Sequence, residues 1–128
     1  MTSNPLSRSS RLLVPAAVLC ACLAGCAGAP PPKTLYGWGD YQTQVYSYLN
    51  GDPKEAQIAV LVGDLQKITA AGKVPPPGYH AQLGLLYVDA GHPVEAIREF
   101  QAEKALFPES ATYMDFVMSS VQAQEHEK

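Results

Sequence analysis

The chain has 128 residues, with 9 basic and 12 acidic side chains and a formal net charge of −3. This acidic balance argues against nucleic acid or an anionic lipid surface as the partner, because both attract basic patches. The length suffices for one small domain with a single core.

The first 25 residues have the features of an export signal. Arg8 and Arg11 precede an apolar run, 12–24, that is too short to span a bilayer as a stable anchor. The run leads into Leu-Ala-Gly-Cys, which resembles the lipobox of bacterial lipoproteins. The resemblance implies cleavage before Cys26 and acylation of Cys26. Because Ala27 follows the cysteine where a retention signal would have Asp, it also implies an outer-membrane location, with the domain facing the periplasm. The alternative is an ordinary secretory signal that happens to contain cysteines.

Cleavage at this point would remove every free thiol. Cys20 and Cys22 leave with the signal, and Cys26 becomes a thioether, so no cysteine remains for a disulfide, a metal or catalysis. The remaining 103 residues would carry seven basic against twelve acidic side chains. Residues 26–34 contain three consecutive prolines and are predicted to be the lipidated cysteine and an extended tether.

A helical domain is predicted over residues 35–123, and its first helix should begin after Asp40, a candidate N-cap, and end at Gly51. The apolar face of this helix is predicted from residues at helical spacing: Tyr41, Val45, Tyr48 and Leu49. Trp38 stands between two glycines. It either stacks on a ligand or, in the favoured interpretation, fixes the start of the chain onto the core.

Aromatic residues crowd this first segment, and we expect some of them to bind a partner. Tyr46 and Tyr48 lie about 200° apart on a helical wheel, so they cannot both face the core. Exposed aromatic side chains are common anchors of protein interfaces. The predicted binding residues are Trp38, Tyr41, Tyr46 and Tyr48.

A longer helix is predicted over 53–71, with Gly72 after it and a rigid turn at the prolines 75–77. Its apolar stripe is predicted to comprise Ala56, Val60 (with Ile58 and Leu61 beside it), Gly63, Leu65 and Ile68.

The stretch 77–110 resembles a tetratricopeptide repeat, a helix–turn–helix unit of 34 residues. The matching core positions are Leu83, Gly84, Tyr87, Ala96, Phe100 and Pro108. Gly91 would end the first helix and Pro93 would begin the second. The resemblance implies two antiparallel helices that approach most closely at Gly84 and Ala96.

The loop before this second helix repeats an earlier one: Gly-Asp-Pro-Lys-Glu-Ala at 51–56 matches Gly-His-Pro-Val-Glu-Ala at 91–96. We therefore predict an all-α fold, a short tetratricopeptide-like array of two antiparallel hairpins and a C-terminal capping helix. Ser110 should cap that last helix. Its inner face is predicted to comprise Tyr113, Phe116, Val117, Ser120 and Val121, and 124–128 should be a polar tail.

Two residues depart from the repeat pattern at the open end of the hairpin. His80 replaces an aromatic residue and Glu103 replaces a small one. Because the start of one helix lies beside the end of the other, we expect His80 and Glu103 to form a polar pair. The alternative is that both side chains point to water.

Three further stretches carry a narrower resemblance: 36–41 (YGWGDY), 76–84 (PPGYHAQLG) and 103–115 (EKALFPESATYMD). Together they are similar to a family of small proteobacterial lipoproteins known as domain of unknown function 4810. Members tend to be encoded beside a lipoprotein similar to the curli secretion pore. The resemblance implies a component of a cell-envelope lipoprotein assembly with such a partner, and no reaction.

The residues themselves indicate no catalytic site. Glu95, Glu99 and Glu103 recur every four positions, which we interpret as a solvated acidic face. The glycines stand singly, and the histidines are far apart, so neither a phosphate loop nor a metal site is expected. We predict a non-enzymatic protein-interaction module with no cofactor besides the lipid. The first alternative is a targeting chaperone, or pilot, that delivers a partner lipoprotein or pore subunit to the outer membrane. The second is a purely structural lipoprotein or a weak enzyme whose site the sequence does not reveal.

Overall fold

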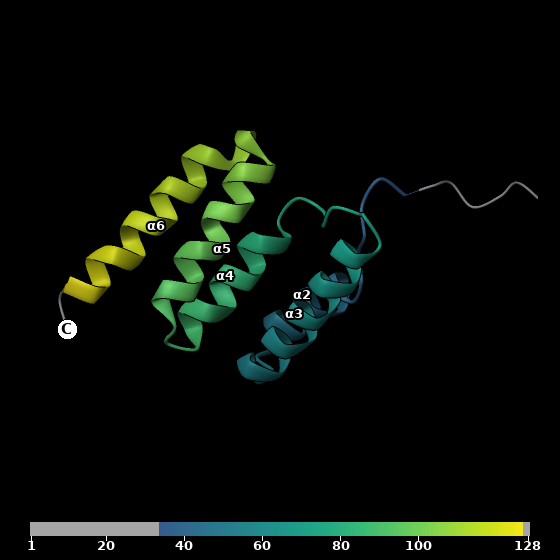
Figure 1. The fold of residues 1–128 in the computed structure, drawn as a ribbon. Coiled ribbons are helices and arrows are strands. Elements are labelled where there is room, and N and C mark those ends of the chain that lie inside the picture. The colour runs from purple at the N-terminus through teal and green to yellow at the C-terminus, as the bar shows by residue number, and fades with distance from the viewer. Residues whose placement is uncertain (1–33, 127–128) are drawn as a thin grey trace, which may run out of the picture. The chain divides into compact units, whose positions relative to one another are not determined.

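The computed structural model describes residues 34–126, so the predicted signal peptide, Cys26 and nearly all of the tether lie outside the described residues. Within this range the chain is helical, and an isolated bridge between Tyr36 and Val74 is its only β-type pairing (Figure 1). The helices are α2 (Tyr41–Asn50), α3 (Lys54–Ala70), α4 (Tyr79–Asp89), α5 (Pro93–Leu106), the short 3₁₀ helix η2 (Pro108–Ser110) and α6 (Ala111–His126). None of these helices is long and apolar enough to cross a membrane.

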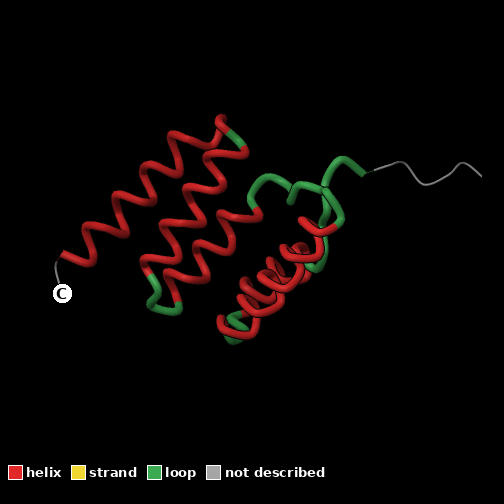
Figure 2. Tube along the Cα trace, viewed as in Figure 1, coloured by secondary structure: helices red, strands yellow, loops and turns green. Residues whose placement is uncertain are grey.

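Consecutive helices pack as neighbours, which confirms the predicted all-α fold of five α-helices in hairpins. Helix α3 packs on α2 and on α4, and α5 packs between α4 and α6, which Figures 1 and 2 show as three helices side by side. The turns that reverse the chain after α2 and α4 each contain a glycine, Gly51 and Gly91, with φ of 78° in both. Left-handed backbone of this kind favours glycine, so the sequence fixes the positions of both turns.

The core consists of two clusters. One joins α3 and α4 through Leu61, Ile68, Tyr79, Leu83 and Leu86. The other joins α5 and α6 through Ala96, Phe100, Met114 and Val121. Tyr87 on α4 is half-buried and packs against both clusters, so it links the two halves of the domain.

The predicted apolar stripe of α3 is right at Leu61 and Ile68, which are buried in the core, and wrong in part elsewhere. Ala56 and Val60 are exposed, and the face turned inward comprises Gln57, Leu61, Asp64 and Ile68. Two polar residues occupy this face because the backbone outside the helix supplies their partners. The Gln57 amide donates to the Asp52 carbonyl (2.9 Å), and Asp64 accepts from the Asp40 amide (2.7 Å). Hydrophobic periodicity does not anticipate such a face.

The predicted faces of the two outer helices are also partly wrong. On α2, Leu49 is exposed, whereas Tyr41 and Tyr48 pack on the core as expected. On α6, Tyr113 and Phe116 are exposed, and Met114 is buried with Val121 instead. On both helices, large apolar side chains are exposed. The size of an apolar side chain therefore does not by itself indicate which face of the helix is buried.

The predicted caps also differ from the structure. Asp40 precedes α2, yet its side chain makes no capping hydrogen bond. The Ser110 hydroxyl donates to the Phe107 carbonyl (2.7 Å) inside the turn, so it does not cap α6. Helix α6 continues to His126, which makes residues 124–126 helical instead of part of a tail.

The segment 34–40 lies along α3, and its glycines allow the close approach. A Cβ on Gly37 would stand 2.8 Å from Ile68, and one on Gly39 would stand 2.6 Å from the Asp64 carboxylate. Gly37 also donates its amide to the Val74 carbonyl (2.9 Å). Trp38, between the two glycines, is 41% exposed and tilts against the Tyr41 ring. The glycines bring the segment onto α3, and the Trp38 ring adds a contact with Tyr41 while it remains partly exposed.

Candidate functional site

Glu103 lies at the junction of α4 and α5, where it caps the start of α4. Its carboxylate accepts hydrogen bonds from the backbone amides of Gly78 (2.6 Å) and Ala81 (3.3 Å), and the residue is almost fully buried. The first amides of a helix have no acceptor inside the helix, and they favour negative charge. The expected pairing of Glu103 with His80 is therefore wrong, because the carboxylate binds these amides.

His80 pairs with Glu99 instead, one turn earlier on α5. Its Nδ1 lies 2.6 Å from Glu99 Oε2, and both side chains are largely buried. The acidic stripe is consequently not a solvated face: Glu99 and Glu103 point into the α4–α5 junction. Sequence reasoning found the right end of the hairpin but assigned the wrong partner.

Tyr41 closes this junction from α2. Its ring packs on the Tyr79 ring (centroids 5.2 Å apart), and a Cβ on Gly78 would meet its hydroxyl at 2.8 Å. Burial, with a contribution from the Glu103 charge, raises the pKa of the Tyr41 hydroxyl. Tyr79 donates its hydroxyl to the Leu61 carbonyl (2.7 Å), and burial raises its pKa strongly. These hydrogen bonds and ring contacts join α2, α3, α4 and α5, so we assign the junction a structural role.

The four predicted binding aromatics do not share one surface. Tyr46 is 68% exposed and Trp38 is partly exposed, but Tyr41 packs on the core. Tyr48 also packs on the core, under the Lys54 ammonium group, which lies 4.5 Å from its ring centroid. Tyr46 and Trp38 are thus the more exposed of the four, and Tyr41 and Tyr48 are partly buried.

The predicted repeat-core residues are mostly where the pattern puts them. Leu83, Ala96 and Phe100 are fully buried, and Tyr87 is half-buried. Gly84 is also buried, and an added Cβ would stand 2.5 Å from the Phe100 ring. Gly84 was expected to pack most closely on Ala96. In the structure, the side chain nearest to Gly84 is that of Phe100. Pro108 begins η2, directly after the end of α5.

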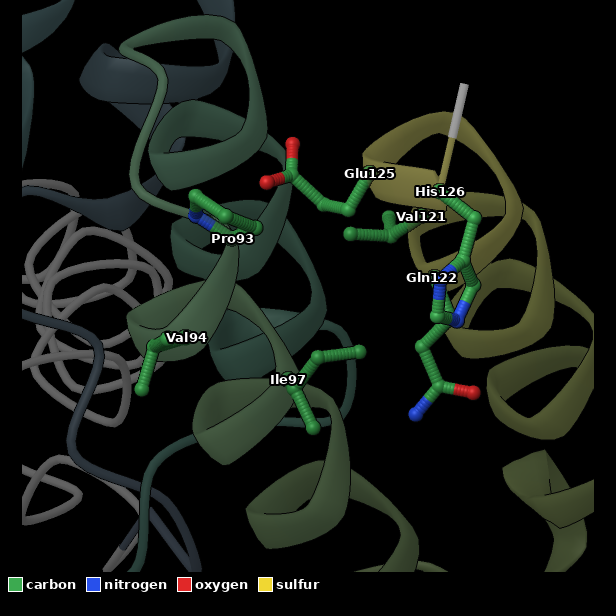
Figure 3. Close-up of a pocket in the computed structure, with 7 residues that line it drawn as sticks. All are labelled: Pro93, Val94, Ile97, Val121, Gln122, Glu125 and His126. Carbon is green, nitrogen blue, oxygen red and sulfur yellow. The ribbon is translucent and has the colours of Figure 1, made fainter. Parts of the chain in front are cut away.

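A groove lies between the start of α5 and the end of α6 (Figure 3). Its volume is about 310 Å³, and its walls are Pro93, Val94 and Ile97 from α5 and Val121, Gln122, Glu125 and His126 from α6. Figure 3 shows the Ile97 and Val121 side chains between the two helices and Glu125 extending toward the first turn of α5. Val94, on the rim, is 68% exposed.

The groove has an apolar floor and a polar wall, which suits the apolar face of an amphipathic helix. Another recess, of about 490 Å³, is lined by α3 alone, through Val62, Leu65, Gln66, Thr69 and Ala70. Because two helices form its walls, the α5–α6 groove can hold a ligand from both sides. Among the described residues, no three His, Cys, Asp or Glu side chains are grouped so that they could hold a metal ion.

Sequence reasoning missed the α5–α6 groove. The last turn of α6 forms one wall of the groove, whereas the sequence predicts a polar tail there. Val94 and Ile97 form the other wall, and neither is a position of the repeat pattern. The spacing of the lining residues could have indicated the groove, because residues four apart lie on the same face of a helix. The pairs at this spacing are Pro93 and Ile97, Val121 and Glu125, and Gln122 and His126.

The comparison with protein-family models gives one match. The model described as "Domain of unknown function (DUF4810)" matches residues 35–117, which covers α2 to α5 and the first half of α6. The comparisons with curated proteins and with solved structures gave no match. Since the matched residues make up more than half of the chain, this protein belongs to the DUF4810 family.

Proposed function

We propose that this protein is a non-catalytic interaction module, anchored to the outer membrane through acylated Cys26 and facing the periplasm. In this proposal it belongs to a cell-envelope lipoprotein assembly whose partner resembles the curli secretion pore. The anchor is supported by the lipobox-like sequence, and the partner by the family resemblance. The observation that carries the interaction role is the α5–α6 groove.

The occupant we propose for the groove is an amphipathic helix of the partner protein. Within the domain, α3 and α5 are each packed between two other helices. Among the described helices, α6 packs on α5 and η2, and none covers the recess between α5 and α6. In an array of hairpins, the next helix would pack there. A partner helix with apolar residues at i, i+3 and i+4 could take that place.

We further propose that the two hairpins are related as tetratricopeptide-like repeats. The loops before α3 and α5 share Gly, Pro, Glu and Ala at the same spacing. Gly51 and Gly91 also share the same φ of 78°. Both observations support one ancestral hairpin used twice, with the second closer to the repeat pattern.

The test of the groove is a variant that charges it without weakening the fold. Val94 is exposed in the first turn of α5, where an aspartate also suits the helix dipole, so Val94→Asp should leave stability unchanged. A buried unpaired carboxylate is costly, so the complex recovered from detergent-extracted membranes should weaken by about tenfold or more. Tyr46→Ala, on the other exposed surface, is the matched control. If Val94→Asp retains the complex and Tyr46→Ala loses it, the partner binds the aromatic surface of α2 and not the groove.

The pilot function predicts a different result in cells. A scaffold stays in a stoichiometric complex with its partner, whereas a pilot releases the partner after delivery. The targeting role predicts that deletion of this protein leaves the partner lipoprotein in the wrong membrane and that no complex survives extraction. These two results together would contradict the scaffold role.

A further inference from the structure

A small apolar surface lies at the point where the described chain begins. Leu35 is 77% exposed, Trp38 is 41% exposed and Val74 is 41% exposed. We call these three residues the tether-side surface. The bridge between Tyr36 and Val74 and the bond from the Gly37 amide to the Val74 carbonyl hold them in one place.

The packing of the intervening residues leaves the tether-side surface facing outward. Tyr36 uses its ring against Phe107 (centroids 6.2 Å apart), and Gly37 and Gly39 lie on α3. Glycine at these two positions brings the backbone down onto the helix, and Trp38 between them stays partly exposed with its ring against Tyr41. A tryptophan and a leucine are thus presented to the surroundings by a segment that is itself fixed.

The covalent distance to Cys26 limits what this surface can meet. Eight residues separate Cys26 from Leu35, and the nine Cα–Cα steps between them span at most about 30 Å when fully extended. If Cys26 carries acyl chains, as the proposed function requires, the tether-side surface is the part of the domain with the shortest covalent path to the bilayer.

We propose that the tether-side surface rests on the phospholipid bilayer, with Trp38 and Leu35 at the level of the headgroups. Tryptophan is enriched at this interface because its ring is apolar and its N–H can remain hydrated. The net charge of the chain is negative, so the contact depends on apolar side chains and is insensitive to salt.

This contact would orient the whole domain. Phe107, which touches Tyr36, follows the end of α5, whereas Val94 and the α5–α6 groove lie at its start. Val94 and Phe107 are thirteen positions apart along α5 and its C-cap, or about 20 Å at 1.5 Å per residue. The groove is then held at the end of α5 away from the lipid, where it is open to a periplasmic partner.

Trp38 is the single tryptophan of the chain, so its fluorescence reports on this surface alone. The acylated full-length protein is reconstituted into vesicles of phosphatidylethanolamine and phosphatidylglycerol, with and without brominated acyl chains. We expect the brominated lipids to quench Trp38, equally at low and high salt. The matched control, Trp38→Phe with Val94→Trp, moves the fluorophore to the groove end of α5 and should escape quenching. Leu35→Glu should reduce the quenching of Trp38 while the protein stays on the vesicles.

The failures of the two proposals are distinguishable. Protein that does not float with the vesicles contradicts the lipid anchor and hence the proposed function. Protein that floats while Trp38 is not quenched, or is quenched no more than tryptophan at position 94, overturns the bilayer contact and leaves the anchor intact. Absence of quenching in vesicles, with protection of Trp38 only in native membranes, would assign the surface to a protein and also overturn the proposal.

Discussion

The carboxylate of Glu103 determines how α4 is held against α5. It is buried and accepts two backbone hydrogen bonds at the start of α4. We expect Glu103→Ala to lower the free energy of unfolding by about 1–3 kcal/mol, because it leaves buried amides without an acceptor. Urea unfolding measures the change, with Gln101→Ala, at an exposed position of the same helix, as the control. Equal stability of the two variants would show that water replaces the carboxylate at no cost.

Asp64 should make the stability of the domain depend on pH. The hydrogen bonds from Lys67 and from the Asp40 amide lower the pKa of Asp64 below its ordinary value of 3.8. A lowered folded-state pKa contributes stability that is present above pH 3.8 and is lost as the pH falls through the folded value. Because the Lys67 side chain is 80% exposed, its ion pair is screened, and the amide contact should contribute more.

The measurement for Asp64 compares wild type with Asp64→Asn by denaturant unfolding at neutral and at strongly acidic pH. The asparagine oxygen can still accept from the Asp40 amide but does not titrate. The stability advantage of the wild type should therefore be present at neutral pH and shrink in acid. A difference that stays constant across this range would mean that Asp64 has the same pKa in the folded and unfolded states.

At the scale of the helices, two glycines provide opposite tests of the packing. Gly84→Ala places a methyl group 2.5 Å from the Phe100 ring and should lower the free energy of unfolding by about 1–3 kcal/mol. Gly63→Ala meets nothing within 4 Å on α3 and should raise it by about 0.5–1 kcal/mol. Thermal and urea unfolding of both variants give the signs. The opposite order would place Gly84 away from the α4–α5 contact.

The helices themselves could be predicted because their boundaries are encoded locally. Gly51, Gly91 and Pro93 each impose a backbone conformation that few other residues favour, and the helices end and begin at them. It was harder to predict which face of each helix points to the core. On α3 the inward position of Asp64 depends on the Asp40 amide, 24 residues away, and no local pattern contains that information.

The candidate site was predicted less well than the fold. The position of Glu103 at the open end of the hairpin followed from the repeat pattern, but its partners are backbone amides, which every residue has. The groove depends on where α6 ends. The polar sequence after Val121 suggested fraying, whereas Gln122 and Glu125 lie on the helix and line the recess.

At the scale of the whole molecule, Cys26→Ser tests the proposed anchor. The residue lies outside the described range and outside the matched domain, so the variant should fold as the wild type does. Without the thiol to acylate, the protein should remain unprocessed or become soluble in the periplasm. Density-gradient fractionation of membranes measures this, and circular dichroism of the purified variant serves as the folding control. Wild-type amounts in the outer-membrane fraction would show that something other than the lipid holds the protein.

The way residues 34–40 lie on α3 has a mechanical consequence. A force that pulls the chain from its N-terminus reaches this segment before any helix, and the amides of Gly37 and Asp40 attach it to Val74 and Asp64. These contacts are loaded one after the other, so the segment should peel away while the helices stay folded. Seven residues then release about 20 Å of extended chain. The segment would then act as a short extensible strap between a pulled N-terminus and the folded helices.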